Sequence, residues 1–206
     1  MTDFLARFGV AHPIIQAPMA GGATTTELVS AVCNAGALGS LAAALFPPQK
    51  ILDSIAALRA VTDRPFNVNL FVLDAPRADE PEIAARITRA EELLAPIRRE
   101  LGLADRKTPA KFCERFEDQL AAVLEAAPAV VSFTFGVVKD TRGLKKKGCA
   151  VIGTATNIAE ARAWEEAGAD AICAQGAEAG AHRGTFIGAP EDSMIPLAKL
   201  VPLILG

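Results

Sequence analysis

The residues best suited to chemistry lie in one stretch, 171–184, where a short apolar run breaks abruptly into glycines and polar side chains. Its first four residues are small or apolar, which is typical of a short strand buried on both faces. Loops that follow the carboxyl ends of parallel strands build the ligand sites of α/β proteins. We therefore expect one pocket to be faced by Gln175, Gly176, Gly180, His182 and Arg183.

His182 is the candidate catalytic residue of this stretch. An imidazole titrates near neutral pH, so it can accept a proton from an acidic carbon and can also steady an anion. The other histidine, His12, precedes the first expected strand, at the end of the sheet away from such loops, and we expect it to be structural. We expect Glu178 to pair with Arg183 or with solvent, and leave it out of the catalytic set. Two distant histidines and four scattered cysteines match no metal-ligand spacing, so no metal site is expected.

The elements that must position these residues alternate between short apolar runs and helical stretches, which is the signature of repeated βα units in an α/β fold. The expected strands are 14–17, 37–40, 66–71, 130–133, 149–153 and 171–174. Within the third strand, Asn67 and Asn69 alternate with apolar residues, so the two amides share one face. Helices are expected from the threonines at 24–26 to Gly36, over 50–61, after Thr108 and Pro109, from Asn157 through Trp164, and over 192–205.

Three motifs carry a resemblance to a known family. They are Gln16-Ala-Pro-Met19, Asn67-Val-Asn69-Leu-Phe71 and the string Gln-Gly-x-Glu-Ala-Gly-x-His-Arg-Gly at 175–184. Over nearly its whole length the chain resembles the nitronate monooxygenases, also called 2-nitropropane dioxygenases, which are FMN enzymes on a TIM-type (β/α)8 barrel. Within the third motif, many family members have glycine where this chain has Ala181.

The resemblance implies the oxidation of an alkyl nitronate or nitroalkane by FMN and O2, giving a carbonyl compound and nitrite. His182 would contact the nitro or nitronate group. The residues that would line the FMN are Ala17, Met19, Asn69, Gln175, Gly176 and Gly180. A nitronate is already an anion and needs no strong base. A neutral nitroalkane does need one, and His182 is the candidate.

The expected architecture is a single partial FMN-binding TIM-barrel domain over 1–206 with about six βα units. Residues 74–107 are dense in charges and prolines, so we expect a helical insertion after the third strand, packed outside the barrel or over its mouth. A closed barrel takes ~250 residues, and loops after its seventh and eighth strands commonly hold the cofactor phosphate. We expect a fragment, a truncated form, or a partial barrel completed by another chain. Exposed strand edges favour association, so a homo-oligomer is one expected outcome.

Composition excludes several other classes of protein. The 206 residues are 51% hydrophobic and 22% charged with a net charge of −3, which suits a soluble globular chain with one core. A weakly acidic balance predicts no nucleic-acid or membrane partner. The N-terminus lacks an apolar signal region, and no run reaches the ~18 apolar residues of a membrane helix. Together with unpaired cysteines, these features predict a cytoplasmic location.

Two alternative functions remain open from the sequence. One is an FMN-barrel reductase that uses NAD(P)H to reduce a quinone or an enoyl thioester, because such an enzyme would share the fold and much of the site. The other is a truncated, non-catalytic flavin-binding module, because the loops expected to hold the phosphate are not in the sequence.

Overall fold

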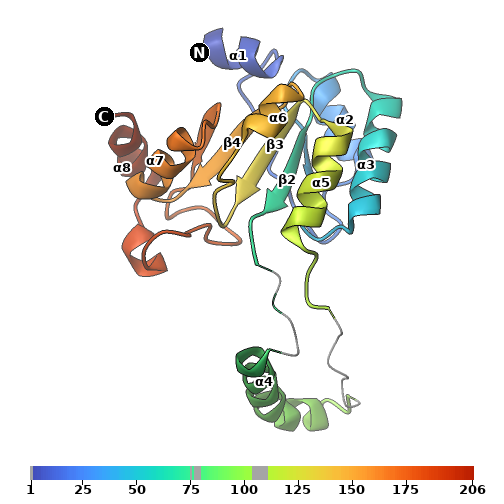
Figure 1. Ribbon diagram of the computed structural model, residues 1–206, viewed down its shortest axis with the longest axis vertical. Coiled ribbons are helices and arrows are strands. Elements are labelled where there is room, and N and C mark those ends of the chain that lie inside the picture. The colour runs from blue at the N-terminus through green and yellow to red at the C-terminus, as the bar shows by residue number, and fades with distance from the viewer. Residues whose placement is uncertain (1, 75, 77–79, 104–110) are drawn as a thin grey trace.

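The computed structural model describes residues 2–74, 76, 80–103 and 111–206. At its centre lies a parallel five-stranded sheet with the sequential order β1-β2-β3-β4-β5 (Figure 1). The strands are β1 (Ser40–Ala42), β2 (Asn67–Phe71), β3 (Val130–Thr134), β4 (Ala150–Ala155) and β5 (Ala171–Ala174). The helices are α1 (Thr2–Phe8), α2 (Thr26–Asn34), α3 (Pro48–Val61), α4 (Pro81–Glu100), α5 (Phe116–Ala126), α6 (Arg142–Lys146), α7 (Ile158–Glu166) and α8 (Leu197–Leu205), with a 3₁₀ turn η1 (Pro190–Ser193).

The expected α/β class is confirmed, and four of the six expected strands become β2 to β5. The first expected strand, 14–17, is instead a single parallel bridge between Ile15 and Leu38. Pro18 ends this run, because a proline has no N–H to extend the ladder. The second strand begins at Ser40, three residues later than expected.

The hydrophobic core fills the space between one face of the sheet and the helices. Val68, Leu70, Val131 and Phe133 point toward α3 and α5 and are fully buried or nearly so. Trp164 of α7 stacks on Phe133, with ring centroids 5.8 Å apart. Gly153 of β4 makes room for this ring, because a Cβ there would lie 2.1 Å from the indole. On the other face a smaller apolar cluster, which includes Val130 and Ile152, packs against α1, and a row of polar side chains lies beside it.

The helix ends follow the capping signals of the sequence. Thr25 and Asn157 cap α2 and α7, each side chain accepting a hydrogen bond from a backbone N–H in the first turn. The expected helix over 192–205 is wrong in its first half, where η1 and a break precede α8. Pro196 disfavours helical backbone in the residue before it, which explains the break. The expected helix start at Thr108 and Pro109 lies outside the described residues.

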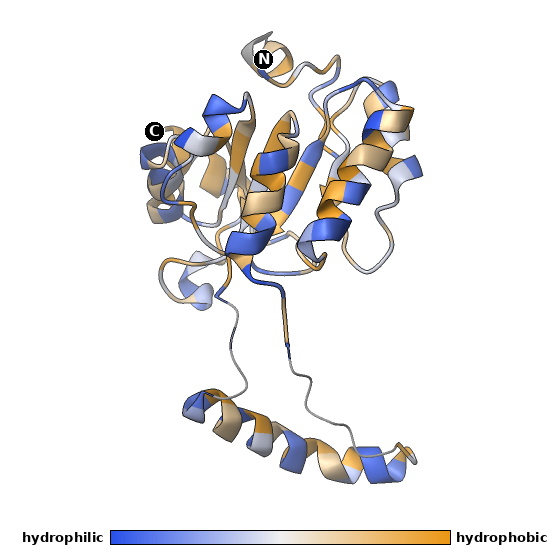
Figure 2. Ribbon diagram, turned by 45° about the vertical axis from the view of Figure 1, so that its right-hand side comes forward, coloured by the Kyte–Doolittle hydropathy of each residue, from blue (hydrophilic) through white to orange (hydrophobic). Residues whose placement is uncertain are grey.

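The 74–107 insertion contains α4, which lies apart from the sheet (Figures 1 and 2). None of its residues is buried, so the expected packing against the barrel is not observed. Apolar and charged residues alternate along it in Figure 2, and Leu93 and Ile97 are more than half exposed. In the described part of the chain, no helix combines the length and the apolar character needed to cross a membrane.

Candidate active site

The face of the sheet opposite α3 and α5 carries a chain of hydrogen-bonded side chains. Asn67 Nδ2 donates to the Ser40 hydroxyl at 3.0 Å and to the Ser132 hydroxyl at 2.8 Å. Asn69 Nδ2 donates to the same Ser132 hydroxyl at 3.0 Å. The register pairs Asn69 with Ser132, which places the two side chains on the same face. The expectation that Asn67 and Asn69 share a face is confirmed.

Gln175 positions the loop that carries His182. Its Nε2 donates to the His182 carbonyl oxygen at 3.0 Å, and its Oε1 accepts from Gly184 N at 2.7 Å. A Cβ on Gly184 would meet Thr134 at 3.1 Å and Thr154 at 3.5 Å. The loop therefore folds back over the carboxyl ends of β3 and β4, where α/β proteins bind ligands.

His182 lies among aromatic rings at this edge. Its ring is edge-on to Phe71, with centroids 6.0 Å apart, and to Phe135, 5.7 Å apart. Phe135 directly follows β3 and has a φ of +71°, a left-handed conformation that bulky residues rarely adopt. The imidazole is exposed, so its nitrogens can reach a ligand. The three rings therefore bring together the end of β2, the residue after β3 and the loop after β5.

Arg183 anchors the loop to its own backbone and does not face a pocket with His182. Its guanidinium donates to the carbonyls of Gln175 at 3.0 Å and Gly176 at 2.8 Å, and also to the Ser193 carbonyl. Glu178 forms no direct ion pair with Arg183, contrary to one of the two expectations. It accepts from Leu197 N at 2.9 Å, and this bond is the largest cause that holds the pKa of Glu178 below its usual range.

Glu160 supports the same loop and was missed in the sequence. It is fully buried and accepts four hydrogen bonds, from Thr156 N, Thr156 Oγ1, Phe186 N and Ile187 N, at 2.6 to 3.0 Å. Its two oxygens thus tie the start of α7 to the segment just after the histidine loop. The order Asn157-x-x-Glu160 is the capping-box pattern, which signals a carboxylate that turns back toward its helix start.

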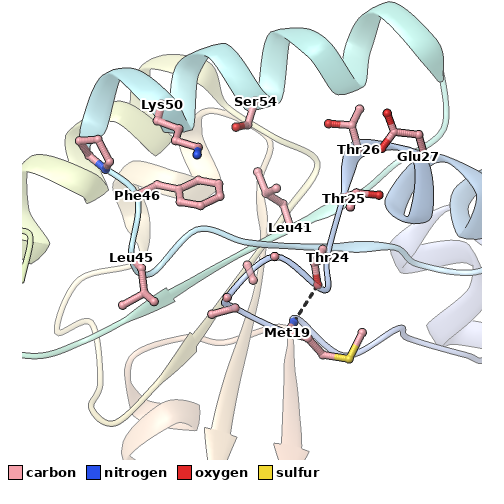
Figure 3. Close-up of a pocket in the computed structure, with 15 residues that line it drawn as sticks. Met19, Thr24, Thr25, Thr26, Glu27, Leu41, Leu45, Phe46, Lys50 and Ser54 are labelled. Carbon is pink, nitrogen blue, oxygen red and sulfur yellow. Dashed lines mark hydrogen bonds between the residues drawn. The ribbon is translucent and has the colours of Figure 1, made fainter. Parts of the chain in front are cut away.

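Ala17 and Met19 lie on the β1 side of the sheet, and Met19 is near the carboxyl end of β1, at the same edge as His182. Ala17 is exposed, and its carbonyl accepts from the Gln16 side chain, whose Oε1 accepts from Ser40 N at 2.9 Å. Met19 lines a cleft of about 580 Å³, together with residues of β1 and α3 (Figure 3). Ala42 also lines the cleft and pairs with Asn69, so the cleft adjoins the row of polar side chains.

The two glycines of the expected flavin site differ in their surroundings. Gly176 is buried, and a Cβ there would lie 2.5 Å from Glu178 and 2.6 Å from Leu197. The space that a side chain at Gly176 would occupy is therefore filled by Glu178 and Leu197. Gly180 is exposed, and a Cβ would meet nothing within 4 Å. Contact of either glycine with a flavin stays a prediction.

The model of the family described as nitronate monooxygenase matches residues 3–205. The chain belongs to the nitronate monooxygenase family. It is 42% identical over 190 residues to the nitronate monooxygenase of Paraburkholderia phytofirmans, covering 88% of this chain and 50% of that protein.

Two solved structures resemble this member of the nitronate monooxygenase family. The nitroalkane oxidase of Streptomyces ansochromogenes is 37% identical with a TM-score of 0.78, covering 95% of this chain and 56% of that one. FabK from Thermotoga maritima is 27% identical with a TM-score of 0.64, covering 97% and 49%. The chain therefore spans about half the length of the relatives it matches, and its five-stranded sheet corresponds to part of their barrels.

Ala181 carries backbone strain next to His182. Its φ is +63°, a left-handed conformation that costs a residue with a Cβ roughly 1–2 kcal/mol. We expect Ala181→Gly to raise the free energy of unfolding by about 0.5–1 kcal/mol, because the relief of strain exceeds the entropy cost of glycine. Urea denaturation measures the change. Ala179→Gly is the matched control, since Ala179 has no positive φ, and equal losses in both variants would contradict the prediction.

Proposed function

We propose that this chain carries the substrate-facing histidine and part of the flavin site of an FMN-dependent nitronate monooxygenase. The reaction is the oxidation of alkyl nitronates or nitroalkanes with O2 to carbonyl compounds and nitrite. The observation that carries the proposal is the placement of His182, which Gln175 holds at the carboxyl edge between Phe71 and Phe135. Family membership supports the same activity.

The polar row on the sheet suits the ring edge of FMN, which presents both N–H donors and acceptors. Asn67 Oδ1 is buried without a hydrogen-bond partner, and Asn69 Oδ1 has none among the described residues. A free acceptor on Asn69, near the carboxyl end of β2, suits a ligand that brings donors. The residues that would hold the ring are Ala17, Met19, Asn69, Gln175, Gly176 and Gly180.

The protein residues have separate roles in the proposed reaction. Bound FMN supplies the redox chemistry with O2. His182 accepts the proton from the carbon next to the nitro group of a neutral nitroalkane, and its protonated form then stabilises the anion. Phe71 and Phe135 bring apolar surface to the same place, which suits an alkyl substituent and keeps water from the reacting carbon.

A second candidate function is NAD(P)H-dependent reduction of a quinone or an enoyl thioester. The structural likeness to FabK is the reason to keep this second candidate, because the likeness covers nearly the whole chain at 27% identity. In this case the aromatic rings would contact a substrate without an acidic C–H, and His182 would bind and orient it.

Two measurements on the purified protein test the proposal. The absorption spectrum reports bound FMN, and its absence after reconstitution with excess FMN would overturn the proposed FMN site, whereas bound FMN without turnover would favour a non-catalytic flavin-binding module. Nitrite release from propionate 3-nitronate is then compared with NADH oxidation in the presence of a quinone. We expect nitrite release and no NADH-dependent turnover. Quinone-dependent NADH oxidation without nitrite release from the nitronate would overturn the proposed activity and support the second candidate.

A further inference from the structure

Ser132 holds the amide of Asn69 in one orientation. Asn69 Nδ2 donates to Ser132 Oγ at 3.0 Å and to the Ser132 carbonyl oxygen at 3.3 Å. Both N–H groups of the amide are thereby used. Rotating the amide by half a turn would break the bond to the Ser132 carbonyl oxygen and bring two acceptor oxygens, Asn69 Oδ1 and Ser132 O, against each other.

Asn67, which lies on the same strand, supports this arrangement. It shares the Ser132 hydroxyl, so that oxygen accepts from two amides and both of its lone pairs are occupied. Asn67 is 2% exposed and Asn69 is 5% exposed, which restricts movement of both side chains. Asn67 Oδ1 is the buried side-chain atom left without a partner in the described part of the chain. The amide nitrogens of the row therefore face protein acceptors, and Asn69 Oδ1 is left without a partner among the described residues.

We propose that Ser132 is a positioning residue that presents Asn69 Oδ1 as a hydrogen-bond acceptor to a ring N–H of the bound flavin. This inference rests on the proposed FMN site. It assigns to Ser132 no contact with the flavin, and its effect passes through Asn69. An Asn69 amide that could rotate would also offer its NH2 group to the ring. The amide held by Ser132 offers only its oxygen. The held amide therefore selects an N–H group of the flavin ring and not one of its carbonyl oxygens.

The test uses Ser132→Ala, with Ser40→Ala as the matched control. Both serines are buried and both accept from Asn67, but only Ser132 contacts Asn69. In the purified protein, titration with FMN should show a dissociation constant about tenfold higher for Ser132→Ala and within about twofold of the parent for Ser40→Ala. Equal weakening by both variants would show a merely structural role and overturn the proposal.

A double-mutant cycle with Asn69→Ala provides the second readout. If Ser132 acts through Asn69, Ser132→Ala should weaken FMN binding by less than about twofold in the Asn69→Ala background. A full tenfold loss there would overturn the proposal.

The orientation itself is measured without flavin, by NMR of the Asn69 side-chain amide. We expect slow hydrogen exchange in the parent and in Ser40→Ala and fast exchange in Ser132→Ala. Absence of FMN binding by the parent would refute the proposed function. Unchanged exchange in Ser132→Ala would refute the positioning role.

Discussion

Replacing His182 with asparagine should lower turnover of neutral nitroalkanes by about 10²- to 10⁴-fold, the usual contribution of general-base catalysis. Asparagine keeps a polar side chain but cannot take up the proton. The loop should survive, because Gln175 holds it through the His182 backbone carbonyl and Gly184 N. FMN content should therefore stay unchanged. Preformed nitronates should be affected less, since their proton has already been removed.

Steady-state nitrite release from nitroethane and from its nitronate measures the difference. His12→Asn is the control, because it removes the other histidine of the chain, which lies beside Gly36 at the opposite end of the sheet. We expect this variant to behave like the parent on both substrates. An equal loss on nitroethane and nitronate in His182→Asn would show that the imidazole is not the base.

The strands that carry the site could be predicted from the sequence because the signals for them are local. Alternation of Asn67 and Asn69 with apolar residues predicts which face each side chain takes, and the register confirms that face. The break after β5 similarly predicts a polar loop at the carboxyl edge. Such inferences need only the two-residue period of a strand and the position where it ends.

The contacts across the site were not accessible in this way. Phe71 and Phe135 meet His182 only because the loop folds back over β3 and β4. Nothing near Arg183 in the sequence distinguishes a residue that binds its own backbone carbonyls from one that faces a ligand. Glu160 is different, since its capping-box spacing was a usable local signal. Its bonds to Phe186 and Ile187 still depend on tertiary structure.

The second large effect is expected at Glu160, because it joins the start of α7 to the segment after the histidine loop. Glu160→Gln replaces one acceptor oxygen with an NH2 group that faces N–H donors. At least two charge-assisted hydrogen bonds are lost, each worth about 1.5–3 kcal/mol. The side chain is fully buried, so water cannot replace them. We expect the free energy of unfolding to fall by about 3 kcal/mol or more.

Urea denaturation of Glu160→Gln measures this loss, and Glu165→Gln provides the matched control. Glu165 lies on the same helix, undergoes the same chemical change and is exposed, so its variant should differ from the parent by less than about 0.5 kcal/mol. Hydrogen exchange at the amides of Phe186 and Ile187 should accelerate in Glu160→Gln alone, because Oε1 is their acceptor. Exchange that stays slow, with stability close to that of Glu165→Gln, would mean that other contacts hold the segment. If the loop loosens as expected, nitroalkane turnover should fall with it, because Gly184 and Gln175 position His182 only while this segment stays against β3 and β4.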